Sequence, residues 1–193
     1  MKKIVLFLFF TLVALCANTT LDYLNTLRTK AGLPSFSLDT SLTNAAQNHS
    51  AYMHTNNVIG HSEDSANSGY TGVSPKDRAL HAGYANRMVG ENVSAGNATA
   101  MESIDGLFSA IYHRLGFLNF YYDSIGIGND THFYTYDMGN HLINQLCQNN
   151  SYTGSGTYYT HVCADTNKKI KASDYINARD HIKNSAPSMI VWP

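Results

Sequence analysis

The stretch from Gly60 to Arg114 constrains the fold of this chain more than any other part of its sequence. It carries Gly60-His61, Gly90-Glu91-Asn92 and His113-Arg114, so two histidines and a glutamate come from three separate segments. Each of them lies beside a glycine or a predicted helix end, and glycine lets backbone segments approach closely. Imidazole and carboxylate groups that converge on one cleft can relay protons or bind a divalent metal ion. His61, Glu91 and His113 are therefore the candidate site residues.

The order and spacing of these pieces resemble the CAP superfamily, also called the SCP/TAPS family, in its bacterial secreted form. In that family a helix runs into a histidine, a loop ends in Gly-Tyr, and Gly-Glu-Asn follows. A second helix then leads into His-Arg before a strand that reads Ile-Gly-x-Gly. The matching pieces here are Asn44 to His61, Ala82 to Tyr84, Gly90 to Asn92, Phe108 to Arg114 and Ile125 to Gly128. The resemblance implies an α+β fold, a three-layer α-β-α sandwich with a central antiparallel sheet.

The resemblance also implies a cleft lined by two histidines and two acidic residues. By position, His61 and His113 match the histidines, and Glu91 matches the glutamate of Gly-Glu-Asn. Zinc or another divalent metal is the cofactor that such a cleft could hold. His61 and His113 would be its ligands, and Glu91 a third ligand or the group that orients a ligand histidine. The alternative is that His61 has a turn or capping role and that Glu91 shapes the backbone around it.

The second acidic residue of the family cleft has no counterpart at its expected place. It would fall a few residues before His113, where this chain has Ser109 and Ala110. Glu102 or Asp105, from the same predicted helix, could replace it. The alternative is that both are solvated charges on an exposed helix face.

The first 17 residues predict export from the cell. Lys2 and Lys3 precede an apolar run from Ile4 to Leu15, and small residues follow. This pattern is typical of a secretory signal peptide cleaved after Cys16 or Ala17, and the run is too short for a standard membrane span. A lipoprotein signal with Cys16 lipidated is the alternative. The expected location is secreted or periplasmic.

Removal of the signal would leave two cysteines, Cys147 and Cys163. An even pair in an exported protein predicts a disulfide, and a pair of free thiols is the alternative. The chain is then expected to comprise the signal peptide at 1–17, the CAP domain at 18–140 and a disulfide-tied C-terminal extension at 141–193. A helix is expected within that extension near Ser173 to Lys183.

Apolar residues at helical spacing predict two helices before the candidate site. One begins near Thr19 and ends by Gly32, and the next begins near Ser37 to Asp39. His49 lies on the buried stripe of the second helix. We expect a core histidine held by a hydrogen bond, with a ligand role as the alternative. In the following loop, Arg78 is expected to bind several backbone carbonyls.

A further helix and two strands are expected after Glu91. Thr99 to Glu102 form a capping box, and the helix it opens should carry Ile111 and Leu115 on its apolar face. If the helix persists, His113 lies on the opposite face with Glu102. Residues 124–128 and 131–138 then have strand patterns, joined by a turn at 128–130. Residues 154–163 and 188–192 are weaker strand candidates.

The composition excludes some functions. The formal net charge is −1 and no basic run occurs, which argues against nucleic acid as a partner. No Gly-x-Ser-x-Gly, His-Glu-x-x-His or Cys-x-x-Cys motif indicates one catalytic chemistry. The expected function is a secreted CAP-domain protein that binds an extracellular or cell-envelope partner, or a small ligand, through its His/Glu cleft or loops. The alternative is a zinc-dependent hydrolase or protease in which His61 or His113 is the general base and Glu91 orients it.

Overall fold

A computed structural model of the chain describes residues 19–186. The predicted signal peptide, the alternative lipidation at Cys16 and the strand expected over 188–192 lie outside these residues. A first helix covers residues 19–30. The later elements are β1 (Ser37–Leu38), α2 (Thr40–Asn56), α3 (Pro75–His81), β2 (Gly90–Ala95), α4 (Ala100–Ser109), α5 (Ile111–Phe117), β3 (Ser124–Asp130), β4 (Phe133–Gly139), α6 (His141–Gln148), β5 (Tyr158–Tyr159), β6 (Ile170–Lys171) and α7 (Ala172–Ser185).

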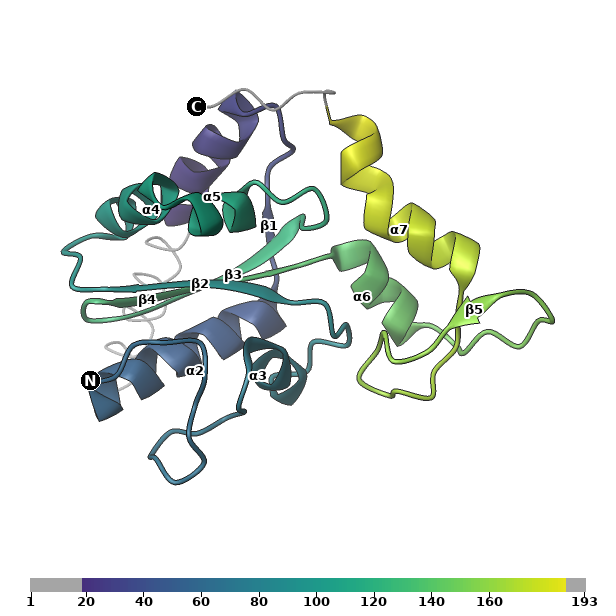
Figure 1. The fold of residues 1–193 in the computed structure, drawn as a ribbon, viewed down its shortest axis with the longest axis horizontal. Helices are drawn as coiled ribbons and strands as arrows, with labels where there is room; N and C mark the ends of the chain where they lie inside the picture. Colours follow the sequence, from purple (N-terminus) through teal and green to yellow (C-terminus); the bar gives the residue numbers. More distant parts are fainter. Residues whose placement is uncertain (1–18, 187–193) are drawn as a thin grey trace, which may run out of the picture.

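The predicted sandwich is confirmed. A four-stranded sheet with the order β1-β3-β4-β2 lies between α2 and α3 on one face and α4 and α5 on the other, with α6 and α7 to one side (Figure 1). The pairs β3–β4 and β2–β4 are antiparallel, and only the two-residue β1 is parallel to its neighbour β3. The register of β2 on β4 places Glu91 opposite Asp137.

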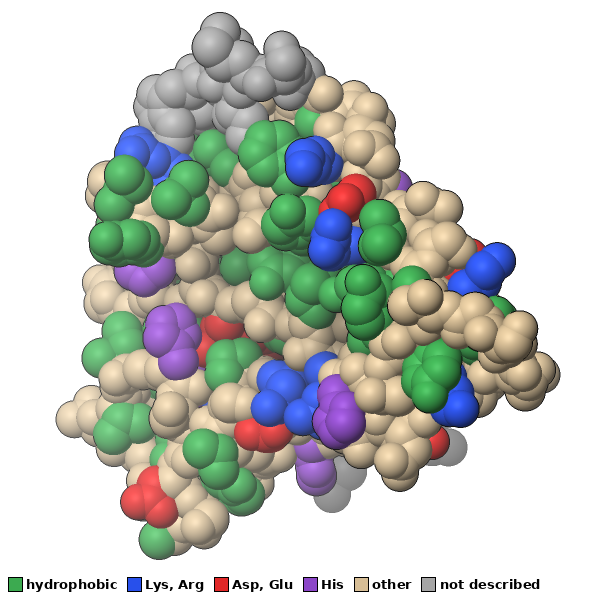
Figure 2. All heavy atoms as spheres, turned by 45° about the vertical axis from the view of Figure 1, so that its right-hand side comes forward, with side chains coloured by type: hydrophobic (Ala, Val, Ile, Leu, Met, Phe, Trp, Pro, Cys, Tyr) green, Lys and Arg blue, Asp and Glu red, His purple; other side chains and the backbone are tan. Residues whose placement is uncertain are grey.

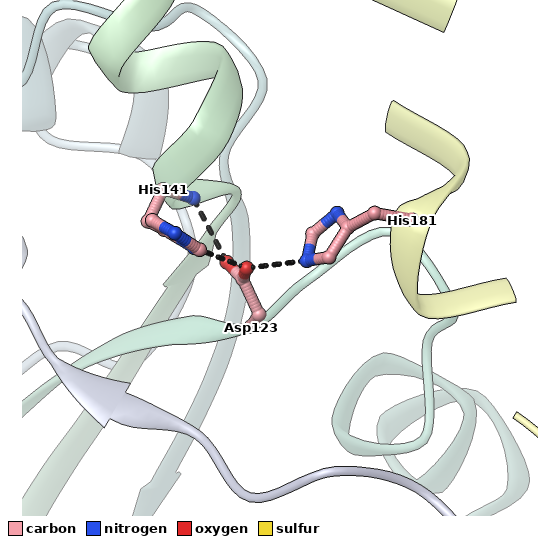
Figure 3. Close-up of side chains that lie close together, drawn as sticks. All are labelled: Asp123, His141 and His181. Atoms are coloured by element: carbon pink, nitrogen blue, oxygen red, sulfur yellow. Dashed lines mark hydrogen bonds and ion pairs between the residues drawn. The ribbon is translucent and has the colours of Figure 1, made fainter. Parts of the chain in front are cut away.

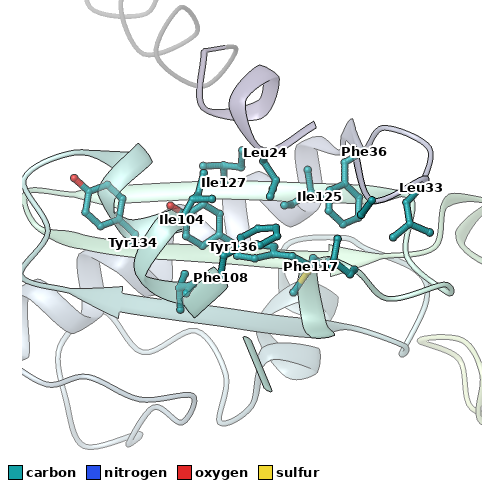
Figure 4. Close-up of a cluster of buried hydrophobic side chains, with 14 of the residues drawn as sticks. Leu24, Leu33, Phe36, Ile104, Phe108, Phe117, Ile125, Ile127, Tyr134 and Tyr136 are labelled. Atoms are coloured by element: carbon teal, nitrogen blue, oxygen red, sulfur yellow. The ribbon is translucent and has the colours of Figure 1, made fainter. Parts of the chain in front are cut away.

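The larger core lies between the sheet and the layer that holds α4, α5 and the first helix. Leu24, Ile104, Phe108, Phe117 and Tyr136 point toward one another there (Figure 4). The Phe117 ring stacks on Phe108 at 5.4 Å and meets Tyr136 edge-on at 5.3 Å between ring centroids. Burial of such aromatic and branched side chains is the main favourable term in folding.

Helix α2 packs unusually close to the opposite face of the sheet. A Cβ added to Gly126 would lie 2.0 Å from the backbone of Leu42, and one added to Gly128 would lie 2.2 Å from the backbone of Ala46. Real Cβ atoms do not approach backbone so closely. The two glycines of the Ile-Gly-x-Gly strand therefore allow α2 to lie directly on β3. This contact fixes the first half of α2 on the sheet, and the candidate site loop leaves from the other end of the helix, after Asn56.

The helix that begins after Thr99 does not continue to His113. Ala110 is extended (φ −96°, ψ 120°), so α4 ends at Ser109 and α5 begins in a new direction. Ile111 and Leu115 are 56% and 57% exposed, so the prediction that they continue the apolar face of this helix is wrong. The reason is a tertiary contact, because the Asn92 side-chain amide donates to the His113 carbonyl (2.8 Å) and holds α5 against β2.

Two other local predictions are corrected. The turn expected at 128–130 lies further on, because β3 continues to Asp130 and the left-handed Thr131 (φ 58°) makes the turn. In the segment 154–163, only Tyr158–Tyr159 form a strand, β5, which pairs with β6. The predicted C-terminal helix is confirmed as α7. The predicted disulfide is confirmed too, with Cys147 and Cys163 bonded at 1.98 Å.

The surface carries charges of both signs. On the face drawn in Figure 2, blue and red side chains lie among green hydrophobic and tan ones and form no continuous basic patch. Within residues 19–186, no helix has the length and the apolar character needed to cross a membrane.

Candidate functional site

The structure brings His61 and Glu91 together. His61 lies in the loop after α2, and Glu91 is the second residue of β2. The His61 Nδ1–H donates to Oε1 of Glu91 at 2.8 Å. The His61 side chain is 49% exposed, whereas that of Glu91 is 1% exposed. A buried carboxylate thus orients a surface imidazole, with Nδ1 facing the protein and Nε2 on the opposite side of the ring.

This contact changes the protonation of His61. The hydrogen bond to Glu91 raises the pKa of His61, and its effect exceeds that of burial, which would lower the pKa. The nearby Arg78 guanidinium opposes the shift only weakly. The imidazolium form of His61 is therefore favoured at mildly acidic pH.

Arg78 holds Glu91 in place from the protein interior. It is fully buried in α3, whose first turn is fixed by a capping box between Ser74 and Asp77. Its Nη2 donates to Oε2 of Glu91 at 2.5 Å, and its Nη1 donates to the His61 carbonyl at 3.0 Å. The sequence predicted several carbonyl partners, and the structure instead gives one carbonyl and the Glu91 carboxylate. Arg78 thereby contacts both members of the His61–Glu91 pair.

Glu63 and His49 complete the buried network. The Glu63 carboxylate bonds Nδ1 of His49 at 2.9 Å and accepts the backbone N–H of Thr71 at 2.7 Å. The Nε2–H of His49 donates to the Gly60 carbonyl at 2.8 Å. Burial alone would raise the pKa of Glu63, but its bonds to His49 and Thr71, with the charge of Arg78, lower it. The predicted core role of His49 is confirmed, with two hydrogen bonds that hold the loop before His61.

Asp137 is the most unusual group near the site. It lies opposite Glu91 in the sheet, is fully buried, and neither of its carboxylate oxygens has a hydrogen-bond partner among residues 19–186. Burial, and next the Glu91 carboxylate, raise the pKa of Asp137 well above its ordinary range. Asp137 therefore holds its proton to a higher pH than an ordinary aspartate does.

The structure does not join His113 to this pair. His113 lies on α5 and is half-buried, and its backbone carbonyl accepts the amide of Asn92. No hydrogen bond connects its side chain to His61 or Glu91 in the described part of the chain. The sequence placed all three residues in one cleft, and the described contacts join only two of them.

The two candidates for the absent acidic residue have other partners. The Glu102 carboxylate accepts the backbone N–H of Ala98 at 2.9 Å before α4. The Asp105 carboxylate accepts the Tyr23 hydroxyl at 2.5 Å. Both side chains are exposed, which favours the interpretation of solvated helix charges. The acids that do lie close to His61 and Glu91 are Glu63 and Asp137.

Only one group of residues within 19–186 has the spacing of three metal ligands. It consists of Asp123, His141 and His181, whose ligand atoms all lie within 4.8 Å of one another. No such group is formed by His61, Glu91 and His113. A zinc ion bound by His61 and His113 therefore stays a prediction, and it requires His113 to move toward His61. Asp123, His141 and His181 are far apart in the chain, so no sequence pattern indicates this group.

Comparisons with known proteins bear on this fold and site. Residues 21–184 match the model of the family described as CAP: Cysteine-rich secretory protein family. A comparison with curated proteins gave no match.

Two solved structures show the same fold. An extracellular protein containing an SCP domain from Bacillus anthracis superposes with a TM-score of 0.57 at 24% identity, over 63% of this chain and 39% of that one. An outer surface protein from Borrelia burgdorferi superposes with a TM-score of 0.54 at 18% identity, over 64% of this chain and 90% of that one. The chain thus spans well under half of the B. anthracis protein. The family match extends over most of the sequence, including the segments that carry His61 and Glu91, and the chain belongs to the CAP, or cysteine-rich secretory protein, family.

Proposed function

We propose that this chain is an extracellular bacterial protein that binds a partner or small ligand through the surface around His61. The observation that carries the proposal is a surface imidazole held rigidly by a buried carboxylate and guanidinium. A binding site needs groups that are oriented before the ligand arrives, because ordering them on binding costs free energy. The predicted signal peptide and the extracellular or outer-surface descriptions of the two related structures support the location.

Exposed apolar side chains lie in the two segments that form this surface. Ile59 is 59% exposed, Val73 53% and Tyr70 38%. The backbone N–H of Glu63 donates to the Val73 carbonyl at 3.0 Å, which keeps the segment of His61 beside that of Val73. Apolar groups that stay exposed together on a folded protein are typical of binding surfaces. We call His61, Ile59, Tyr70 and Val73 the His61 surface.

The chemistry of the His61 surface indicates what it would take. The raised pKa of His61 favours the imidazolium, whose Nε2–H can donate a charge-assisted hydrogen bond. The apolar neighbours favour an apolar ligand group beside it. The expected ligand therefore combines an apolar body with an anionic or hydrogen-bond-accepting group, such as a peptide with a free carboxylate.

The test is a binding panel followed by two-dimensional NMR. Apolar dipeptides with free carboxylates, fatty acids and cell-wall fragments would be added to the labelled protein at pH 6, each beside a form with the carboxylate amidated. We expect chemical-shift changes that are largest at His61, Ile59 and Val73 and that become smaller when the ligand carboxylate is amidated. His61→Ala should abolish them. His54→Ala is the matched control, because His54 is 48% exposed and also pairs with a carboxylate, that of Asp130.

Two outcomes would overturn the proposal. One is that no member of the panel shifts the signals of the His61 surface. The other is that His61→Ala leaves binding unchanged, or weakens it no more than His54→Ala does. In either case the His61–Glu91 pair would be a structural contact of the loop.

A zinc-dependent hydrolase is the second candidate. The observation that favours it is the direction of the His61 ring, because metal-binding histidines commonly donate their other nitrogen to a carboxylate. Zinc titration of wild type beside His61→Ala and His113→Ala tests the ion, and turnover of peptide, ester and cell-wall substrates tests the reaction. Zinc binding and turnover that survive both substitutions would exclude this candidate.

A further inference from the structure

We propose that Asp123, His141 and His181 form a binding site for a divalent transition-metal ion, with zinc as the best fit. The three come from separate places in the fold. Asp123 immediately precedes β3, His141 is the first residue of α6, and His181 lies in the second half of α7. Their side chains point toward one another in Figure 3. This site is independent of the His61 surface and of the function proposed for it.

The Asp123 carboxylate is the centre of the group. Its Oδ2 contacts Nδ1 of His141 and lies 2.8 Å from Nε2 of His181. Its Oδ1 accepts the backbone N–H of His141 at 2.8 Å, which fixes the plane of the carboxylate. The side chain of Asp123 is 9% exposed, against 47% for His141 and 28% for His181. The group is thus anchored on its inner side and open to solvent on its outer side.

The hydrogen bonding of His181 is the second observation, because it orients the ring. Its Nδ1 lies 2.7 Å from the Ala178 carbonyl, which can only accept, so Nδ1 carries a hydrogen. Nε2 is thus the atom that faces the Asp123 carboxylate, at 2.8 Å from Oδ2. A backbone carbonyl on the other ring nitrogen is also the usual arrangement for a metal-binding histidine.

The residues behind the group are fixed as well. Asn140 caps α6 by accepting the N–H of Ile143 at 2.9 Å, and its amide donates to the same Ala178 carbonyl at 3.1 Å. This carbonyl therefore holds both His181 and the start of α6. Supporting contacts of this kind restrict how far the ligand atoms can move before the ion arrives.

The ligand set selects the kind of ion. Two imidazole nitrogens and one carboxylate oxygen suit zinc and similar metals, whereas calcium and magnesium prefer oxygen ligands alone. Tetrahedral zinc with bonds of about 2.0 to 2.1 Å places its ligand atoms roughly 3.3 Å apart. The Asp123 and His181 atoms, at 2.8 Å, would separate slightly, and the half-exposed His141 can rotate to follow. Water would complete the coordination from the open side.

One nearby charge opposes the ion. The Arg28 guanidinium is buried and interacts electrostatically with Asp123, while its Nη2 donates to the carbonyl of Tyr122 at 3.1 Å. We therefore expect weaker binding than at a structural zinc site made of cysteines. A bound ion would connect α7 and α6 to the start of β3, and binding to the folded state alone would stabilise the protein.

The test is zinc titration calorimetry on the untagged protein after removal of metals with a chelator. We expect one zinc per chain in wild type, and affinity at least tenfold weaker in His181→Ala and in His141→Ala. The second variant guards against a folding defect, because His141 is half-exposed. His61→Ala and His113→Ala should bind as wild type does. Zinc should also raise the melting temperature of wild type and not that of His181→Ala.

Three outcomes would overturn the proposal. The first is no saturable zinc binding by the wild-type protein. The second is binding that both His141→Ala and His181→Ala retain in full. The third is binding that His61→Ala and His113→Ala abolish while His181→Ala retains it, which would place the ion at the other pair of histidines. Loss of ligand binding at the His61 surface would leave the metal proposal unaffected, so the two can fail separately.

Discussion

His61 and Glu91 form a pair in which the surface residue is oriented by the buried one. One oxygen of the Glu91 carboxylate accepts a hydrogen bond from the His61 imidazole, and the other accepts one from the Arg78 guanidinium. Arg78 is fully buried. The direction of the His61 ring is therefore set by the core of the protein. A loop histidine without such support would sample several directions and would lose more entropy on binding a ligand.

Glu91→Gln should lower the pKa of His61. The bond to Glu91 raises the pKa of folded His61 above its ordinary value of 6.5. The pair therefore stabilises the folded protein fully below that pH, and the stabilisation is lost as pH rises through the raised pKa. NMR titration of the His61 ring measures the change. Glu102→Gln should leave the titration unaltered, and an unchanged His61 pKa in Glu91→Gln would contradict the assignment.

Asp137→Asn should stabilise the protein increasingly as pH rises. The raised pKa of Asp137 means that the folded state keeps a proton that the unfolded state loses near pH 4. Wild type therefore loses stability as pH rises from there toward the folded pKa, by up to about 1.4 kcal/mol per pH unit, whereas the neutral amide does not.

Urea unfolding of Asp137→Asn and wild type at pH 5 and pH 8 measures this difference. The exposed Asp22→Asn is the control and should follow the wild type at both pH values. A gap between Asp137→Asn and wild type that stays constant with pH would show that Asp137 is ionised in the folded protein.

Gly128→Ala should destabilise the fold, because the added Cβ would meet the Ala46 backbone at 2.2 Å and force α2 away from β3. We expect a loss of about 1–3 kcal/mol or more in the free energy of unfolding. Gly106→Ala is the matched control. It lies inside α4 with nothing within 4 Å of the new Cβ, so it should gain about 0.5–1 kcal/mol. Equal effects of the two substitutions in urea unfolding would refute the close contact.

Replacing both Cys147 and Cys163 by serine should lower the free energy of unfolding by roughly 3 kcal/mol in the chain-entropy model. The disulfide ties α6 to a segment that also bonds the loop before β2, through Ala164 N–H to the Ala85 carbonyl at 2.8 Å. Urea unfolding with and without reductant checks the value. Wild type in reductant should have the same free energy of unfolding as the double variant. A wild type that is equally stable with and without reductant would show that the disulfide does not stabilise the fold.

Much of the fold could be predicted because its signals are local. Asp39 caps α2 by accepting a hydrogen bond from the Leu42 N–H. The spacing of apolar residues along that helix correctly predicts that His49 is buried. The alternating residues of β3 and β4 predict the central hairpin. The break at Ala110 could not be predicted in this way, because it depends on Asn92 holding the His113 carbonyl from another element.

The candidate site was predictable only in part. The family motifs led to His61 and Glu91, which the structure joins. Glu63 and Asp137 were missed because a carboxylate in a loop or strand normally indicates an exposed position, whereas both are buried in the folded protein. The signal that could have indicated Asp137 is its place in a strand whose other residues are mostly apolar.

The measurement that tests the central claim most directly is the pH titration of the His61 ring by NMR with and without a saturating apolar carboxylate ligand. If the ligand's anionic group pairs with Nε2, the pKa of His61 should rise further on binding, while that of His54 stays the same. Identical His61 titrations with and without bound ligand would contradict a binding role for the His61 surface.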